Sequence, residues 1–567
     1  MLFEANLGRL RPLYWAKPSS ENFRAYRLPS VAYVPSGLDD ESLFMTEVFE
    51  QILHQRDRPS GAPANNNTLL RSFKPYFNSG LPFKSTQTQQ WEPHLRQSET
   101  QTIPLIDVQH ILTQLLTLLK PGDRPWLHCG AEGLTTAEFR DRLAQLDGVI
   151  VNHPSGSSDT YRFTLRETVL AAGLVPQPDQ IFFVDEVVAA LLGSGGGDRL
   201  GTGDAVGTAI AGPCLVLSAG ASTTEILVIG AAKPLTQLTP QDRYIRRLAY
   251  AGNSLDQDII CHLLYPIARG WESLDLPGLN LPLPGEPDLE ARYRLQQRLE
   301  SVPLGQRLLN SVRKIKPILC QQDVSFAADG RQWTIRQQDL QNWIIAPYLQ
   351  QLNREINGLL PQIGLTSDQI QQVICAGETT MIPAIATWLQ EKFPQARFIA
   401  QDGTAENLGP SVAAGLALFP CFPALLEADR HQFSDYFLLH ILLQHLQQDN
   451  KTRFGLGDLQ QRLSQSGVPS EVSRTFLANL LEGRLPSGLA ITPASAVLFA
   501  ESSVQCPDYQ RLGAAPLFQS LANDRYELNS QQCDRLWAHL QTILAHTHQT
   551  LQTPLSLAAL ASTQPQA

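Results

Sequence analysis

Residues 215–228 read Leu-Val-Leu-Ser-Ala-Gly-Ala-Ser-Thr-Thr-Glu-Ile-Leu-Val. Two apolar segments flank a run of small residues, and this pattern predicts a strand, a tight turn and a second strand. Such a turn lets backbone N–H groups approach a phosphate closely, and the Ser and Thr hydroxyls add further donors. Taken alone, the stretch fits an ordinary β-hairpin turn better than a phosphate site, because small residues are common in such turns.

Short apolar segments on both sides of this hairpin also predict strands. They lie at residues 148–152, 181–184, 214–217, 225–229 and 372–375. Helical patterns follow most of them, for instance at 164–173 and 383–393. Continuous Val, Ile and Leu segments of this length are typical of strands that are buried on both faces of a mixed sheet. The alternation of strands and helices therefore predicts an α/β fold.

The pattern changes after about residue 420. Residues 424–447 predict a helix that is apolar nearly all round, and the rest of the chain lacks strand–turn–strand spacing. We therefore predict a domain boundary near residues 419–423 and a mainly helical domain at 424–567. Three segments predict loop-rich insertions because they are rich in Gly, Pro or polar residues, and they lie near 56–103, 193–212 and 272–288.

Composition limits the classes of partner. The 567 residues include 44 Lys and Arg and 54 Asp and Glu, so the net charge is −10 and gives no global attraction for nucleic acid or an anionic membrane. No uninterrupted apolar stretch reaches the roughly 18 residues of a membrane span. The eight cysteines form no Cys-x-x-Cys pair, which disfavours a zinc or redox site and fits buried free thiols in a reducing compartment. We expect a cytoplasmic protein without a nucleic-acid partner.

Seven short segments carry recognisable motifs, and their order along the chain is informative. They are residues 28–33, 171–191 (an Ala-Ala-Gly-Leu turn, a strand and a helix), 218–225, 251–256 (Ala-Gly-Asn-Ser-Leu-Asp), 312–320, 373–383 (Val-Ile-Cys-Ala-Gly-Glu-Thr-Thr-Met-Ile-Pro) and 409–417. In this order the region from residue 1 to about 418 resembles the nucleotide-binding domain of the heat-shock-70-type (DnaK-like) chaperones. The resemblance implies a two-lobed actin-like ATPase (ribonuclease-H-like) domain at 1–420.

The resemblance also implies a site. Residues 218–225 are similar to the second phosphate hairpin, 312–320 to the adenosine-contacting helix, and 181–191 and 409–417 to the two connecting helices. The implied nucleotide-binding residues are Asn6, Gly8, Arg9, Ser218, Gly220, Ser222, Thr223, Thr224, Gly252, Lys316, Gly377 and Glu378. Two catalytic residues are implied: Glu186, which would order the metal and the attacking water, and Lys74, which would approach the γ-phosphate.

These assignments have alternatives. Lys74 equally fits a solvated loop lysine. Glu186 equally fits a residue that caps or pairs near a helix start. For Asp256, a helix cap is the favoured interpretation over a contact with nucleotide.

The departures from the family pattern bear on catalysis. Asn6 and Ser218 replace the two aspartates that hold Mg²⁺ through water in the family, and such losses typically cost ~10–100-fold each. Ala221 crowds the phosphate turn, and Glu378 replaces a glycine. ATP or ADP is the implied ligand, but these changes argue against Mg²⁺ and against fast hydrolysis. Arg9 could pair with a phosphate in place of the metal.

Three functions remain open. The leading hypothesis is a divergent heat-shock-70-like protein that binds ATP or ADP weakly or not at all and acts as a chaperone-like or assembly factor, with a protein partner on its helical C-terminal domain. The alternative is an active ATPase with a substituted metal site, and a distant third is a sugar or metabolite kinase. Residues 459–477 also have a helix–turn–helix layout, but 451–485 carry only five basic and three acidic side chains, which is weak support for DNA binding.

Overall fold

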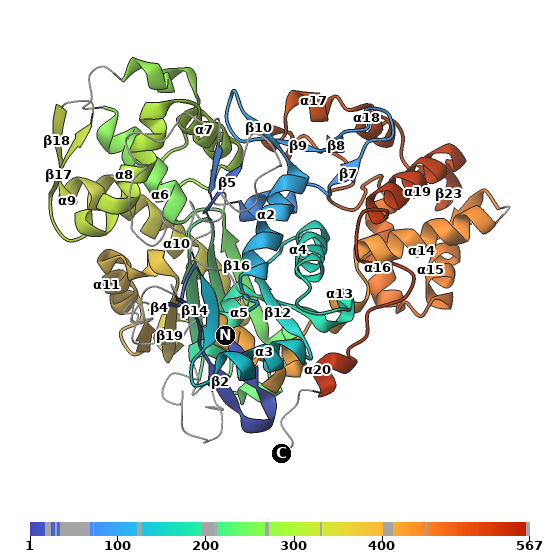
Figure 1. Cartoon of the computed structure of the whole chain (residues 1–567), viewed down its shortest axis with the longest axis horizontal. Coiled ribbons are helices and arrows are strands. Elements are labelled where there is room, and N and C mark those ends of the chain that lie inside the picture. Colours follow the sequence, from blue (N-terminus) through green and yellow to red (C-terminus); the bar gives the residue numbers. More distant parts are fainter. Residues whose placement is uncertain are drawn as a thin grey trace.

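The computed structural model describes residues 1–16, 24–28, 31–34, 68–71, 73–121, 127–194, 210, 212–266, 271–328, 331–400, 412–449 and 451–562. It is a mixed α/β protein, as the alternation of strands and helices predicts (Figure 1). Parts of the segments predicted at 28–33, 56–103, 193–212 and 409–417 lie outside the described residues.

A five-stranded mixed sheet forms the centre of the molecule. Its strands are β14 Cys214–Ala219, β15 Thr224–Ile229, β16 Arg243–Leu248, β19 Gln372–Ala376 and β20 Arg397–Ala400. Their order is β16-β15-β14-β19-β20. The pairs β14–β15 and β15–β16 are antiparallel, whereas β14–β19 and β19–β20 are parallel. The predicted strands at 214–217, 225–229 and 372–375 are therefore confirmed.

Helices cover both faces of this sheet. Their bounds are α5 Glu186–Ser194, α6 Gly252–Asp258, α8 Pro303–Leu319, α10 Ala346–Leu359, α11 Pro383–Lys392 and α12 Val412–Leu418. Leu215 and Leu217 pack into one core with α8, α10 and α11, while Cys214 and Val216 pack into another with α5 and α12. Because both faces are covered, every side chain of the strand is buried, which explains the unbroken apolar sequence.

A second group of strands precedes the sheet. The parallel pair is β12 Val149–His153 and β13 Ile181–Asp185, which confirms the predictions at 148–152 and 181–184. Helix α4, Asp159–Ala171, connects the two strands and is buried on nearly all its residues. It begins five residues before the predicted helix at 164–173.

Shorter elements complete this part of the chain. They are β1 Leu2–Glu4, β2 Arg9–Arg11, β3 Leu13–Ala16, β4 Arg24–Ala25, β5 Val31–Val34, β6 Thr68–Arg71, β7 Phe83–Lys84, β8 Trp91–Glu92, β9 His94–Arg96, β10 Thr102–Pro104, α2 Leu105–Thr117, β11 His128–Ala131, α3 Thr136–Ala144, α7 Leu289–Ser301, β17 Val324–Ala328, β18 Arg331–Ile335 and α9 Gln337–Leu340.

The helix predicted at 424–447 is wrong as a single element. The chain forms α13, Ala428–Gln432, and then α14, Asp435–Gln448. Ser434 separates them, because its Oγ accepts a hydrogen bond from the Phe437 backbone N–H and caps the second helix. The apolar surface of α14 is a core element, with Leu439 and Leu442 fully buried.

Residues after 450 contain a small sheet that the sequence analysis missed. Strands β21 Arg453–Gly455, β22 Phe518–Ser520 and β23 Arg525–Leu528 pair in the order β21-β23-β22. Between the last two strands, Asn523 and Asp524 both have positive φ, 60° and 52°. Asn and Asp are the non-glycine residues that tolerate this conformation best, so this dipeptide was the missed turn signal.

Helices form the rest of the C-terminal part, as predicted. They are α15 Leu456–Gln465, α16 Ser470–Leu481, α17 Glu501–Val504, α18 Pro507–Gly513, α19 Ser530–Leu544 and α20 Ala558–Ser562. The core shared by α14, α15, α16, α18 and α19 also takes in Phe83 and Phe163, so these helices pack directly onto α4 and β7 (Figure 1). Within the described residues, no helix combines the length and the apolar character needed to cross a bilayer.

Candidate site around the turn at Gly220

The turn between β14 and β15 is held by backbone groups from two distant segments. The Gly220 carbonyl accepts hydrogen bonds from the Gly252 N–H at 3.1 Å and from Thr379 Oγ1 at 2.7 Å. The Ala221 carbonyl accepts one from the Asn253 N–H at 2.8 Å. The segments that the sequence analysis placed at one site, 218–225, 251–256 and 373–383, therefore meet at this turn.

Residues 377–380 pack against the Gly220 turn, and position 377 requires glycine. Gly377 has a φ of +86°, and a Cβ there would lie 2.3 Å from the Ala219 carbonyl oxygen. Thr380 donates its hydroxyl to the Gly377 carbonyl at 2.7 Å. Close backbone packing therefore requires glycine at position 377. Glu378 projects into solvent, and its nearest charged partner is Arg27 at 3.6 Å.

Lys316 reaches the same place from α8. Its Nζ lies 2.9 Å from the Gly252 carbonyl and 2.7 Å from the Asp256 carboxylate. Arg313 Nε lies 3.6 Å from Asp256. Burial raises the pKa of Asp256, while the two cations oppose the shift. The interpretation of Asp256 as a helix cap is wrong, because it lies inside α6 and anchors the cations of α8.

Glu186 also lies close to the turn. It is the first residue of α5, and Asn152 at the end of β12 donates its amide to Glu186 Oε2 at 2.8 Å. Glu186 Oε1 lies 3.9 Å from the position that a Cβ on residue 220 would occupy. A carboxylate in the first turn of a helix is also favoured by the helix dipole. A carboxylate, Glu186, and a lysine, Lys316, therefore both lie near the turn.

Glu225 is a candidate residue that the sequence analysis did not single out. It lies on β15 directly after the turn, is 2% exposed, and accepts hydrogen bonds from the Ser155 N–H and Oγ at 2.7 and 2.9 Å. Burial, together with the nearby Glu186 charge, raises the pKa of Glu225 to about 7. The missed signal was a carboxylate inside an otherwise apolar strand that begins at the turn.

The N-terminal hairpin contributes residues to a neighbouring cavity. Asn6 and Lys74 line a cavity of about 850 Å³ together with Asn152, and most of the remaining lining is apolar. Asn152 therefore connects this cavity with Glu186. Gly8 adopts a φ of 57° in the turn between β1 and β2. The exposed Arg9 follows it and has no ion pair among the described residues.

The remaining predicted residues differ in their surroundings. Ser218 is buried, and its Oγ has no hydrogen-bond partner among the described residues. Thr224 bonds to the Tyr250 carbonyl and the Tyr348 hydroxyl, both at 2.7 Å, so its hydroxyl holds the fold together and is not available to a ligand. Ser222 and Thr223 are half-buried at the turn.

The described part of the chain contains no group of three His, Cys, Asp or Glu side chains that could hold a metal ion. Comparison with models of known protein families and with curated proteins finds no match to this chain.

Proposed function

We propose that this chain is a divergent heat-shock-70-like protein whose cleft takes a nucleotide, with little or no hydrolysis, and that it acts as a chaperone-like or assembly factor. One observation carries the proposal. Segments separated by up to 159 residues meet at the Gly220 turn, and they bring Glu186, Gly252 and Lys316 to its sides. These are residue types that bind the phosphates and sugar of a nucleotide.

The topology supports the same proposal. Three antiparallel strands followed by two parallel ones, in the order β16-β15-β14-β19-β20, suit one lobe of an actin-like ATPase. The proposed connecting helices α5 and α12 lie against each other, and Gly415 allows the close approach because a Cβ there would be 1.8 Å from the Ala189 carbonyl. We assign β12, β13 and the N-terminal hairpin to the other lobe.

Weak catalysis follows from the chemistry of the site. Phosphoryl transfer depends on positioned cations and a metal ion that neutralise the developing charge. Asn6 and Ser218 supply no carboxylate, and Lys316 already bonds to Asp256. A nucleotide would therefore compete with an existing ion pair for this lysine. We expect weak binding of ATP or ADP, and no dependence on Mg²⁺.

A second candidate function is an active ATPase with a different set of carboxylates. Glu225 and Glu186 favour it, because both lie beside the turn and the Glu186 charge contributes to the raised pKa of Glu225. A buried carboxyl with a pKa of about 7 has the proton affinity that suits a general base near neutral pH. The Glu225→Gln and Glu186→Gln variants test this alternative in a phosphate-release assay, and loss of a measurable rate in both would support the enzyme.

The binding experiment uses a matched pair of glycine variants. A Cβ on Gly220 meets only Glu186 Oε1 at 3.9 Å, so Gly220→Ala preserves the fold but fills the space where a phosphate would approach. Gly230→Ala is the control, because a Cβ there has no neighbour within 4 Å. Calorimetric titration with ATP and ADP, with and without Mg²⁺, should show affinity that falls about 10-fold or more in Gly220→Ala only.

The outcomes separate the alternatives. Equal binding by both glycine variants would place the nucleotide elsewhere. No heat at millimolar nucleotide in the folded wild type would overturn nucleotide binding and leave a scaffold. Binding that needs Mg²⁺ would favour the ATPase.

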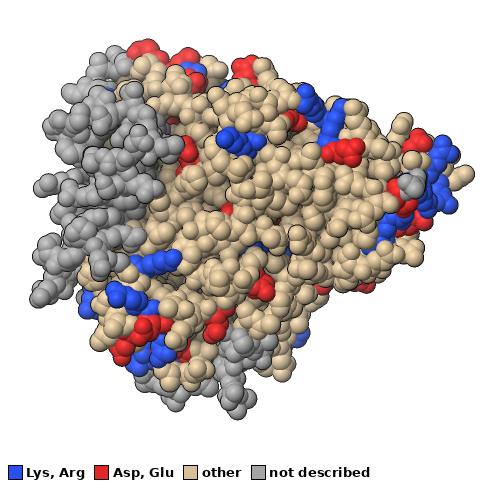
Figure 2. All heavy atoms as spheres, turned by 45° about the vertical axis from the view of Figure 1, so that its right-hand side comes forward, with Lys and Arg blue, Asp and Glu red and all other residues tan. Residues whose placement is uncertain are grey.

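The protein partner is assigned to the C-terminal part, residues 424–567. Four of its basic side chains have carboxylate partners: Lys451 and Arg525 pair with Asp458, Arg453 with Glu527 and Arg462 with Asp449. On the face shown in Figure 2, Lys and Arg are sparse and lie among Asp and Glu. This distribution disfavours a phosphate backbone, which binds through clustered unpaired cations, and supports a protein partner.

A further inference from the structure

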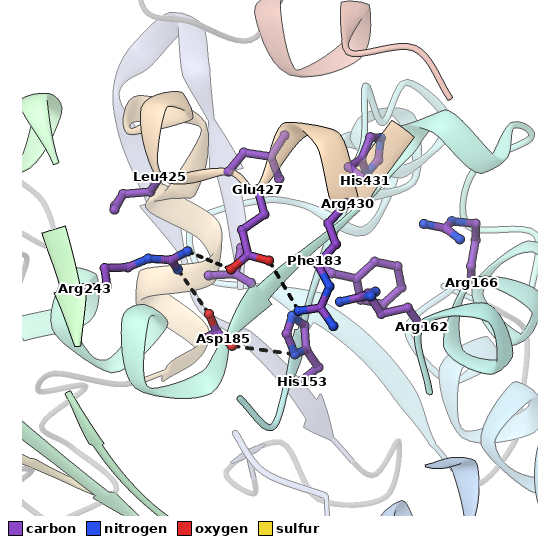
Figure 3. Close-up of a pocket in the computed structure, with 12 residues that line it drawn as sticks. His153, Arg162, Arg166, Phe183, Asp185, Arg243, Leu425, Glu427, Arg430 and His431 are labelled. Carbon is purple, nitrogen blue, oxygen red and sulfur yellow. Dashed lines mark hydrogen bonds and ion pairs between the residues drawn. The ribbon is translucent and has the colours of Figure 1, made fainter. Parts of the chain in front are cut away.

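A small cavity separate from the Gly220 turn lies where α4, β13, β16 and α13 meet. Four arginines and two carboxylates line it: Arg162, Arg166, Arg243 and Arg430, with Asp185 and Glu427. In Figure 3, Arg162, Arg166 and Arg430 extend toward the region around Phe183 from two different elements, α4 and α13. The lining thus gathers more positive than negative charge in the interior of the protein.

Three of the four arginines have carboxylate partners. Arg243 lies 3.1 Å from Asp185 and 2.9 Å from Glu427. Arg430 lies 3.4 Å from the same Glu427. Arg162 pairs with Asp159 in the preceding turn of α4. One guanidinium of the lining therefore remains without a carboxylate partner among the described residues.

Arg166 is that guanidinium. It is 5% exposed and has no carboxylate partner among the described residues. Within the described part of the chain, its one polar contact is a long hydrogen bond of 3.4 Å from Nη1 to Gln549 Oε1, and its Nε has none. The Phe183 ring lies 5.1 Å from its Cζ. Burial, with repulsion from Arg162, lowers the pKa of Arg166 to about 10.

An unpaired buried charge is costly, and proteins avoid it by pairing the charge or by binding an ion. The cavity volume is about 20 Å³. Since a water molecule needs roughly 10–15 Å³, this space accepts one small inorganic anion and excludes a nucleotide or a peptide carboxylate. The ligand that fits both the charge and the volume is therefore an ion of the size of chloride.

We propose that this cavity is a binding site for a small inorganic anion such as chloride, which neutralises Arg166 and fastens the C-terminal part to α4. The site goes beyond the proposed nucleotide cleft. Arg430 belongs to α13, and Gln549 follows α19. An anion held by Arg166 and Arg430 would therefore bridge the two parts of the chain.

The test is the thermal midpoint of the full chain as chloride replaces gluconate at constant ionic strength. Wild type should gain about 2 °C with saturation, because a ligand that binds only the folded state stabilises it. Arg166→Gln should lose this dependence, whereas Arg140→Gln, which removes an exposed arginine on α3, should keep it. A midpoint that is indifferent to chloride, or a gain that survives in Arg166→Gln, would overturn the proposal.

A second measurement requires no variant. Crystals of the wild type soaked in bromide should give an anomalous peak within hydrogen-bond distance of Arg166, and its absence at the cavity would reject the site. Sulfate in the same thermal titration should give no gain, because the volume excludes a larger oxyanion. A gain with sulfate that Arg166→Gln abolishes would contradict the assigned size of the ligand.

Discussion

At the scale of the residue, Glu225 connects the candidate site with the pH dependence of stability. Burial raises its pKa from 4.5 to about 7, so the folded state binds its proton more tightly than the unfolded state. The free energy of unfolding should therefore fall as the pH rises from about 4.5 to about 7. Glu225 accounts for a decrease of at most about 3 kcal/mol. Glu225→Gln keeps a carbonyl acceptor for the Ser155 N–H but cannot ionise, and it should remove this slope.

The measurement is the denaturant midpoint of wild type and Glu225→Gln from pH 5 to pH 8. The two proteins should be similar at pH 5, and the variant should be the more stable one at pH 8. Glu391→Gln, on an exposed surface, is the control and should leave the slope unchanged. A difference between wild type and Glu225→Gln that is constant with pH would show that Glu225 does not titrate in this window.

At the scale of the element, the packing of α12 on α5 depends on Gly415. A Cβ at this position would lie 1.8 Å from the Ala189 carbonyl oxygen and 2.8 Å from the Gly193 nitrogen. Alanine favours helix by about 1 kcal/mol over glycine, but separating two packed helices costs about 1–3 kcal/mol. Gly415→Ala should therefore lower the free energy of unfolding by up to about 2 kcal/mol.

Gly358→Ala is the matched control for this prediction. Gly358 is an exposed residue inside α10, where a Cβ has no neighbour within 4 Å. Alanine should therefore stabilise the protein there by up to about 1 kcal/mol. Chemical denaturation of both variants measures the two effects, and an equal gain in both would mean that α12 and α5 are not in close contact.

The elements that the sequence predicts correctly are those with the simplest local patterns. The strands at 214–217 and 372–375 are continuous apolar segments, which two-sided burial requires. The break in the helix predicted at 424–447 depends on one hydroxyl, that of Ser434, which caps α14. The apolar residues on both sides of Ser434 hide this signal in the sequence. The strands β21, β22 and β23 have only three or four residues each, too few for a periodic pattern.

The same contrast applies to the candidate site. The sequence pattern marks the turn at Gly220, and the resemblance places Gly252, Lys316 and Glu186 beside it. Periodicity cannot show which partners these residues already have. Lys316 pairs with Asp256, and Thr224 bonds to Tyr348, because segments far apart in the sequence meet there. Such contacts depend on tertiary packing and leave no local signal.

At the scale of the whole molecule, α4 joins the α/β part to the C-terminal part. The Thr160 hydroxyl of α4 lies at hydrogen-bond distance, 2.9 Å, from the Tyr436 hydroxyl, and Glu167 accepts a hydrogen bond from the His548 backbone N–H at 2.9 Å. Its Phe163 lies in the C-terminal core. Neither part can unfold without exposing buried polar groups of α4, so we expect the chain to unfold as one cooperative unit.

Tyr436→Phe tests this cooperativity. The Tyr436 hydroxyl donates to the Ser487 carbonyl at 2.5 Å, so its removal leaves this buried acceptor unpaired and should cost about 1–3 kcal/mol. In a calorimetric scan, wild type should show one transition, and the variant should shift that whole transition to a lower temperature. Tyr244→Phe, at an exposed tyrosine, should leave it unchanged. Two separable transitions, only one of which moves in Tyr436→Phe, would mean that residues 424–562 fold independently of α4.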